Sequence, residues 1–542
     1  MFKLVLAALL LGAFPAVAKP PRLTLVITMD AVGTDVLLRN RSHFRLGLKT
    51  LLDQGAFFPN ASYEYNEPVT AAGHTTLATG ANPWRHGIVG NRVVNRLTGK
   101  SEPIFLDANH PVLEVPLALD DSSPEHILAE TLSDRLRFAT QGRGKAVAIS
   151  VKARAAIAQG GRLGQAWWFN DGVGKFVTGT FYAKEFPAWV KGFNARKVPD
   201  SYFGKTWQLS LPAAQYLGED DRAFEGSDVG LGRIFPHPMS AGLLAPGAQA
   251  RQALESTPAM GDVLVQFARA ALDGEQLGKD EVPDLLWVSF SQTDAVYHAY
   301  GPYSWEMQDA LVRLDKSVGE LLLAAEKAAG GKQNLLVVVS ADHGGAPIPE
   351  EAVVAGLQSA RLKPSTLKGN LNRELQKRFG AELALAVDVN RVYLNAKGMA
   401  DRKLDGADVR RAAAQWLGTQ PGIAVAVARD DLDGASELGG YARALRRGYF
   451  PERSGDVLLV YKPYVVLEEH DTGANHGSPY AYDTQVPVVF FGKGIRPGLY
   501  PAEVHPVDVA PTLAVLLELG MPAQAEGVPL TSALASPVTA RP

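Results

Sequence analysis

The segment LTLVITMD, residues 23–30, is a near-continuous apolar run that ends in a carboxylate, Asp30. A central strand of a parallel sheet is buried on both faces, so it carries apolar residues at nearly every position. The same pattern recurs along the chain. Four more runs of this kind are found at residues 146–151, 285–290, 335–339 and 486–491.

Segments with helical periodicity separate these runs. The clearest covers residues 307–328, where Leu311, Leu314 and Val318 fall on one face, and a second covers residues 126–138. Strands that alternate with helices predict an α/β fold, a doubly wound, mostly parallel sheet flanked by helices. Ligands of such sheets bind beyond the carboxyl ends of the strands, and four of the five runs end there in charged or metal-capable residues.

Two regions interrupt the alternation, and we interpret both as insertions that together form a cap over the edge of the sheet. The first is rich in Gly, Pro and aromatic residues, which we assign to the core of the cap rather than to a binding platform. The second has helix-like segments on both sides of a strand-like one, residues 383–395. The predicted division is a signal peptide at 1–18, catalytic core at 19–159, 281–349 and 466–542, and insertions at 160–280 and 350–465.

The first eighteen residues have the pattern of a secretory signal peptide. Lys3 is followed by an apolar run at residues 4–11, and cleavage is predicted after the small residue Ala18. The run is too short for a stable membrane span, although an uncleaved anchor is the alternative. We therefore expect a periplasmic or secreted protein whose mature chain does not span a membrane.

The composition of the chain excludes some partners and modes of attachment. The 542 residues carry a formal net charge of -3 with dispersed Lys and Arg, which gives no reason to expect a nucleic-acid partner. The sequence contains no Cys, so disulfides and a lipoprotein anchor are excluded.

A threonine stands in the most informative stretch, EPVTAAGHTTLATGANPWRHGIVGN, residues 67–91. Thr70 precedes small residues and a helix-like segment, so its hydroxyl is expected at or near a helix N-terminus, where an anion is favoured. A Thr in that position is most often only an N-cap. His74 and His86 follow closely, and we interpret both as structural residues of the loop.

Six Asp and His residues, nearly all at loop ends after apolar strands, change the interpretation of this threonine. Asp294 and His298 are four residues apart, so on a helical turn they share a face. Each short motif alone is more often a cap, a turn or a surface pair. Together they predict two cation sites, one formed by Asp294, His298 and His476, and the other by Asp30, Asp342, His343 and the Thr70 oxygen. Imidazole and carboxylate ligands without thiolate suit Zn, with Mn as the main alternative.

At these positions the chain resembles the alkaline phosphatase superfamily, specifically the bacterial alkaline phosphatases with a threonine nucleophile (PafA type), which are related to nucleotide pyrophosphatase/phosphodiesterases. The resemblance implies two Zn ions per subunit, a covalent phosphothreonine on Thr70 and release of inorganic phosphate. It also implies that Asn91, Lys152 and Arg154 bind the non-bridging phosphate oxygens. Without the metal set, Lys152 and Arg154 would be ordinary charges at a solvated strand end.

Charge favours phosphate monoesters as substrates. Two divalent ions, three Asp and a Thr70 alkoxide are neutral together, so Lys152 and Arg154 leave an excess positive charge that complements a near-dianionic phosphate. The prediction is an exported, metal-dependent phosphomonoesterase. The alternatives are a phosphodiesterase, a phosphonoacetate-type hydrolase, or a metal- or phosphate-binding envelope protein without activity.

Overall fold

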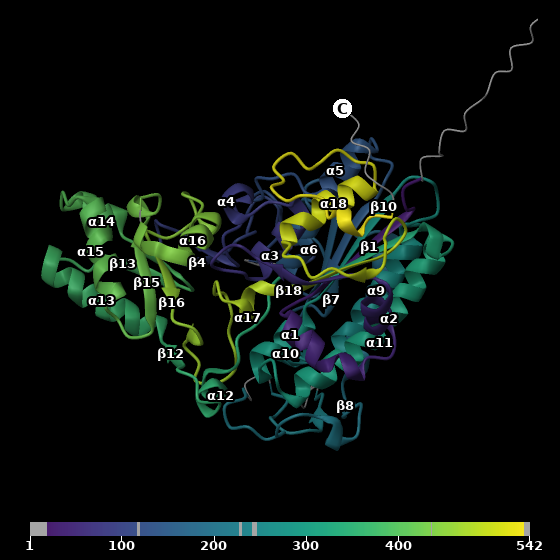
Figure 1. The fold of residues 1–542 in the computed structure, drawn as a ribbon, viewed down its shortest axis with the longest axis horizontal. Helices are drawn as coiled ribbons and strands as arrows, with labels where there is room; N and C mark the ends of the chain where they lie inside the picture. Colours follow the sequence, from purple (N-terminus) through teal and green to yellow (C-terminus); the bar gives the residue numbers. More distant parts are fainter. Residues whose placement is uncertain (1–18, 116–119, 227–229, 241–245, 435, 536–542) are drawn as a thin grey trace, which may run out of the picture.

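The structure is a computed structural model that describes residues 19–115, 120–226, 230–240, 246–434 and 436–535 (Figure 1). The predicted signal peptide, residues 1–18, lies outside the described residues. Within these ranges no helix combines the length and apolar character that a bilayer crossing requires.

A nine-stranded sheet forms the centre of the molecule, in the order β19-β2-β18-β11-β1-β10-β5-β6-β7. Its central strand, β1, pairs in parallel with both β10 and β11, whereas β18 is antiparallel to β11. The five predicted strands are all present and the mostly parallel α/β fold is confirmed. The strand bounds are β1 Leu23–Met29, β2 Ala56–Ser62, β5 Ala146–Ser150, β6 Gln165–Asn170, β7 Lys175–Val177, β10 Asp284–Phe290, β11 Leu335–Ser340, β18 Gln485–Gly492 and β19 Gly498–Leu499.

Helices cover both faces of this sheet because successive side chains of its strands point to opposite sides. Leu25 and Ile27 of β1 pack in one core with α9 (Ala259–Gly274) and α11 (Trp305–Ala329). Val26 packs in a second core on the other face with α18 (Val509–Leu516).

The predicted start agrees with the structure for one helix and differs for another. Helix α11 begins after Ser304, whose hydroxyl accepts from the Met307 N–H at 3.0 Å, close to the predicted start. The helix predicted at residues 126–138 begins later, as α5 (Leu132–Ala139), because Thr131 and Asp134 form a capping box there.

The region predicted as the first insertion, residues 160–280, belongs partly to the sheet. It contributes β6 and β7, and Phe176 of β7 stacks on Phe267 of α9 with ring centroids 3.8 Å apart. The predicted boundary at residue 160 was therefore wrong. The aromatic residues that obscured the strand pattern, such as Trp167, are buried core side chains.

The second insertion forms a lobe beside the sheet, here called the inserted lobe (residues 360–467). Its four-stranded sheet has the order β13-β14-β16-β15 and its own apolar core. In Figure 1 the lobe lies to one side of the central sheet, away from β8 (Thr206–Trp207) of the first predicted insertion, although Arg222 and Glu351 of the two predicted ranges form an ion pair at 2.6 Å. The bounds are β12 Ala360–Leu362, α13 Pro364–Phe379, β13 Ala384–Asp388, β14 Arg391–Leu394, α15 Gly406–Gly418, β15 Ile423–Ala428, β16 Val457–Tyr461 and β17 Val465–Leu467.

The segment predicted as one strand, residues 383–395, is a hairpin of β13 and β14. Its turn, Val389–Asn390, points back to the central sheet, where Asn390 bonds to Asn66 and Gly477.

Candidate active site

The predicted site residues gather at the carboxyl edge of the central sheet. Asp30 follows β1, Lys152 follows β5, and Asp342 follows β11. Asp294 lies in the first turn of α10 (Gln292–Tyr300), directly after β10. These four strands are parallel neighbours, so their carboxyl ends bring the four side chains together.

Thr70 is the first residue of α3 (Thr70–Thr79) and is 1% exposed. The N-cap is Val69, which makes no side-chain cap, so Thr70 is not the capping residue. Its hydroxyl instead accepts a hydrogen bond from Lys152 Nζ at 3.3 Å. Gly73 allows the close approach of this helix to β11, since a Cβ there would lie 2.1 Å from the Asp342 carbonyl oxygen.

The first predicted cation group is assembled around one oxygen of Asp294. Its Oδ1 lies 3.4 Å from His298 Nε2 and 3.7 Å from His476 Nε2. The other ring nitrogens contact backbone carbonyls: His298 Nδ1 donates to Ala474 at 2.9 Å, and His476 Nδ1 donates to Pro68 at 3.2 Å. A carbonyl only accepts, so each Nδ1 carries the proton and each Nε2 is left as a ligand atom that faces Asp294.

The second group lies against the first. Ligand atoms of Asp30, Asp294 and His343 are all within 4.8 Å of one another, so Asp294 belongs to both groups. His343 Nε2 is 3.5 Å from Asp30 Oδ1 and 3.5 Å from Asp342 Oδ2. Its Nδ1 donates to the Gly344 carbonyl at 2.8 Å, which again leaves Nε2 as the ligand atom.

The residues of both groups fit a metal, because four of their candidate ligand atoms are buried and unsatisfied. Asp30 Oδ1, Asp294 Oδ1, Asp342 Oδ2 and His343 Nε2 have no hydrogen-bond partner among the described residues. Buried polar atoms are nearly always paired, and an uncompensated buried carboxylate is costly. A set of oxygen and imidazole donors without sulfur suits Zn or Mn.

Electrostatics also favours added positive charge at this edge. Burial raises the pKa of Asp342, and the neighbouring Asp30 raises it further. Burial alone would raise the pKa of Asp30 too, but the Lys152 ammonium at 3.0 Å and the His343 ring together outweigh burial and hold that pKa well below its usual range. Lys152 also bonds to Asp294 Oδ2, so one ammonium serves two of the three carboxylates.

Of the three residues predicted to bind phosphate oxygens, Lys152 and Asn91 contact the first turn of α3. Asn91 Oδ1 accepts from the Ala71 N–H at 2.8 Å, which fixes this amide against the first turn of α3. Arg154 lies in the first turn of α6 (Ala153–Gly160). Its Nε is buried without a hydrogen-bond partner in the described part of the chain, as expected of a donor that awaits an anion.

The histidines set aside as structural have contacts in keeping with that interpretation. His74 Nε2 bonds to Ser289 Oγ at 2.7 Å, and its Nδ1 lies 3.1 Å from Asp342 Oδ2. His86 bonds to Thr76 Oγ1 at 3.1 Å.

Two supporting residues were not singled out from the sequence. Asp483 Oδ2 accepts from the N–H groups of Gly477 and Ser478, so it shapes the loop that carries His476. Asp483 lies only seven residues after His476, and this proximity in the sequence could have indicated its role. Asn390 contacts the same loop from the inserted lobe, and nothing in its local sequence indicates this.

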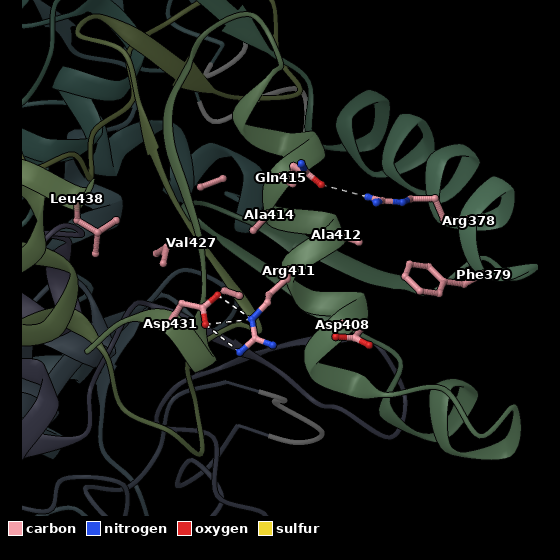
Figure 2. Close-up of a pocket in the computed structure, with 12 residues that line it drawn as sticks. Arg378, Phe379, Asp408, Arg411, Ala412, Ala414, Gln415, Val427, Asp431 and Leu438 are labelled. Carbon is pink, nitrogen blue, oxygen red and sulfur yellow. Dashed lines mark hydrogen bonds and ion pairs between the residues drawn. The ribbon is translucent and has the colours of Figure 1, made fainter. Parts of the chain in front are cut away.

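A broad hollow of about 680 Å³ lies elsewhere, in the inserted lobe (Figure 2). It is lined by the end of α13, by α15 and by β15, and the ion pair of Arg411 with Asp431 spans 3.0 Å at its side. None of the predicted site residues lines it, so this hollow is separate from the candidate site.

Comparison with known proteins places the chain in a family. Residues 24–482 match the family model described as type I phosphodiesterase / nucleotide pyrophosphatase. The chain is 34% identical over 538 residues to alkaline phosphatase PafA of Elizabethkingia meningoseptica, with 97% of each chain covered. It is 30% identical over 523 residues to a protein of Myroides odoratus named calcium-transporting ATPase, with 95% of each covered. A crystal structure of wild-type PafA matches with a TM-score of 0.88 and 31% identity, covering 96% of this chain and 100% of that one.

Proposed function

The chain belongs to the type I phosphodiesterase / nucleotide pyrophosphatase family, and we propose that it is an alkaline phosphatase that hydrolyses phosphate monoesters and releases inorganic phosphate. The observation that carries the proposal is the position of Thr70, a buried hydroxyl at a helix N-terminus, 3.3 Å from Lys152 Nζ. Unpaired carboxylate and imidazole atoms at the same edge, chiefly those of Asp294 and His343, support a metal-assisted reaction.

Two zinc ions would be held by the two groups of residues, one by Asp294, His298 and His476, the other by Asp30, Asp342 and His343 with the Thr70 oxygen as a further ligand. When bound, they supply Lewis acidity that lowers the pKa of a hydroxyl and stabilises the leaving oxygen. Manganese is the alternative ion for these donors.

In the proposed reaction, the Thr70 Oγ1 alkoxide attacks phosphorus in line as the bond to the leaving oxygen breaks, which gives a phosphothreonine, and the leaving oxygen takes a proton from solvent to become an alcohol. Water then attacks the same phosphorus from the opposite side, frees the Thr70 oxygen and releases phosphate. Lys152 and Arg154 neutralise the non-bridging oxygens, and Asn91 donates to one of them. Fixed charges and dipoles of this kind provide most of the catalysis of phosphoryl transfer.

Charge supports a monoester rather than a diester. With two divalent ions, Asp30, Asp294, Asp342 and a Thr70 alkoxide are balanced, and the cations of Lys152 and Arg154 remain for a dianionic phosphoryl group. A diester carries one negative charge and needs no such pair. The terminal phosphate of a nucleotide has the same near-dianionic character, so ATP hydrolysis by a relative is compatible with this chemistry.

The second candidate is a phosphodiesterase, which the description of the family favours. A panel of an aryl phosphate monoester, an aryl diester and a phosphonate separates the two. We expect the highest kcat/KM on the monoester, and a higher value on the diester would contradict the assignment.

We also propose that the protein is exported to the periplasm or secreted after removal of residues 1–18. N-terminal sequencing of the mature protein should begin at Lys19. A retained Met1 would contradict this.

The nucleophile is tested by Thr70→Ala. Loss of the hydroxyl removes the acceptor for the phosphoryl group, so we expect a fall in aryl phosphate turnover of at least about 10³-fold with zinc retained. A wild-type rate in this variant would end the assignment, and zinc uptake without phosphate release by the wild type would favour a binding protein.

A further inference from the structure

The turn of the inserted lobe that reaches the central sheet makes two hydrogen bonds there. Asn390 is 1% exposed, and its Nδ2 donates to the carbonyl oxygen of Asn66 at 2.8 Å and to that of Gly477 at 2.9 Å. One amide group therefore joins two segments that are more than 400 positions apart in the sequence, using both of its N–H donors.

These two acceptors flank the hydrogen bond that orients His476. Asn66 precedes Pro68 by two residues, Gly477 directly follows His476, and His476 Nδ1 donates to the Pro68 carbonyl at 3.2 Å. The same segment continues to Thr70 two residues later. Asn390 therefore holds together the chain that carries the proposed nucleophile and the loop that carries a proposed metal ligand.

The next residue reinforces the junction. Arg391 is 2% exposed, and its Nη2 lies 2.8 Å from Glu67 Oε1. Gly90 packs against this pair, since a Cβ there would lie 2.5 Å from Arg391 Nη2 and 2.8 Å from Glu67 Oε1. Asn91 directly follows Gly90. Asn390 and Arg391 therefore contact the three segments that carry Thr70, His476 and Asn91.

The backbone of the turn is held in an unusual conformation. Val389 has φ 47°, a left-handed value that is rare for a β-branched residue. The Tyr461 hydroxyl donates to the Val389 carbonyl at 2.6 Å and holds it there. A backbone conformation of this kind persists where the surrounding contacts require it. Here it orients the Asn390 side chain toward its two acceptors.

We propose that Asn390 is a positioning residue of the active site, which acts through Asn66 and Gly477 to hold the His476 side chain in position relative to Thr70. The inference rests on the proposed function, because it gives His476 and Thr70 their roles. The inserted lobe then takes part in the reaction through a hydrogen-bonded turn. Outer partners that orient a metal ligand typically contribute 10- to 100-fold in metal affinity or activity, which sets the expected size of the effect.

The test compares Asn390→Ala with Asn372→Ala as a matched control. Asn372 is also a buried amide of the inserted lobe with two hydrogen bonds, but both go to Ala384 within the lobe, at 2.7 and 3.2 Å. Each zinc-loaded protein is challenged with a chelator, and the rate of zinc release is measured beside kcat and KM on an aryl phosphate.

We expect Asn390→Ala to release one of its zinc ions at least about 10-fold faster and to lose about 10- to 100-fold in kcat/KM. Asn372→Ala should keep wild-type zinc release and kinetics, whatever its effect on Tm. If Asn390→Ala fails to fold, Asn390→Ser, which keeps one donor, should give an intermediate release rate.

Wild-type zinc release from the Asn390 variants, or equal acceleration in Asn372→Ala, would overturn the inference. Failure of the proposed function itself is seen separately, as absence of monoester hydrolysis by the zinc-loaded wild type.

Discussion

The central sheet and the inserted lobe contribute to the candidate active site in different ways. The sheet supplies side chains directly beyond its strands, as with Asp30 after β1 and Asp342 after β11. Among the described residues the lobe supplies no candidate ligand, and its turn at Asn390 contacts the segments that carry Thr70 and His476. Residues that are positioned by strand ends can be read from a sequence, whereas residues that act through a distant turn cannot.

The largest effect is expected at the sheet, from Asp294→Asn. Asp294 belongs to both cation groups, so its loss should weaken both metals and lower kcat by at least about 10³-fold, measured on an aryl phosphate with metal analysis of the same sample. Asp315→Asn is the control, since Asp315 is a buried Asp that caps α2 (Gly47–Gln54) through the N–H groups of Arg45 and Leu46. It should lower Tm and keep two zinc ions. Full zinc content and activity in Asp294→Asn would contradict the shared role.

A smaller effect is expected from the two cations predicted to bind the phosphate oxygens. Lys152→Ala and Arg154→Ala should each lower kcat/KM on a monoester by about 10²- to 10³-fold and affect a diester much less, because only the monoester presents a dianion. The ratio of the two kcat/KM values is the measurement. An equal loss on both substrates would show that these residues do not select for phosphate charge.

The smallest effect concerns the contact of Glu67 with Arg391 of the inserted lobe. Burial raises the pKa of Glu67 to about 8, although Arg391 opposes the shift. A carboxyl with a raised pKa binds its proton more tightly when folded, so wild-type stability should fall as pH rises from about 4.5 to about 8 and then level off. Glu67→Gln lacks this titration. The difference in unfolding free energy between the two should change by at most about 1.4 kcal/mol per pH unit in that window.

Urea unfolding at pH 5, 7 and 9 measures this difference. If the unfolding free energies of the wild type and of Glu67→Gln change in parallel between pH 5 and 7, Glu67 keeps an ordinary pKa and Arg391 offsets the effect of burial.

The sequence predicted the fold where a single physical cause dominates. Both faces of β1 are buried, so its apolar run was unambiguous, and the same holds for β11. Beyond residue 160 two causes compete, since the Trp167 and Trp168 side chains belong to a strand near the sheet edge and also to an aromatic core. Periodicity alone could not separate them.

The residues of the candidate site also differ in how far the sequence predicts their positions. Asp294 and His298 share a helix turn, so their proximity followed from spacing. The convergence of His476 on Asp294 depends on a loop whose course is set by Asp483 and Asn390, and no local pattern encodes it.

The central claim is that two divalent ions lie beside Thr70 at the carboxyl edge of the sheet. Anomalous diffraction at the zinc edge from crystals of the zinc-loaded protein tests it most directly. We predict two peaks about 4 Å apart, one against His298 and His476, the other against Asp30 and His343. A single peak outside this edge, or no peak at Asp294, would contradict the account.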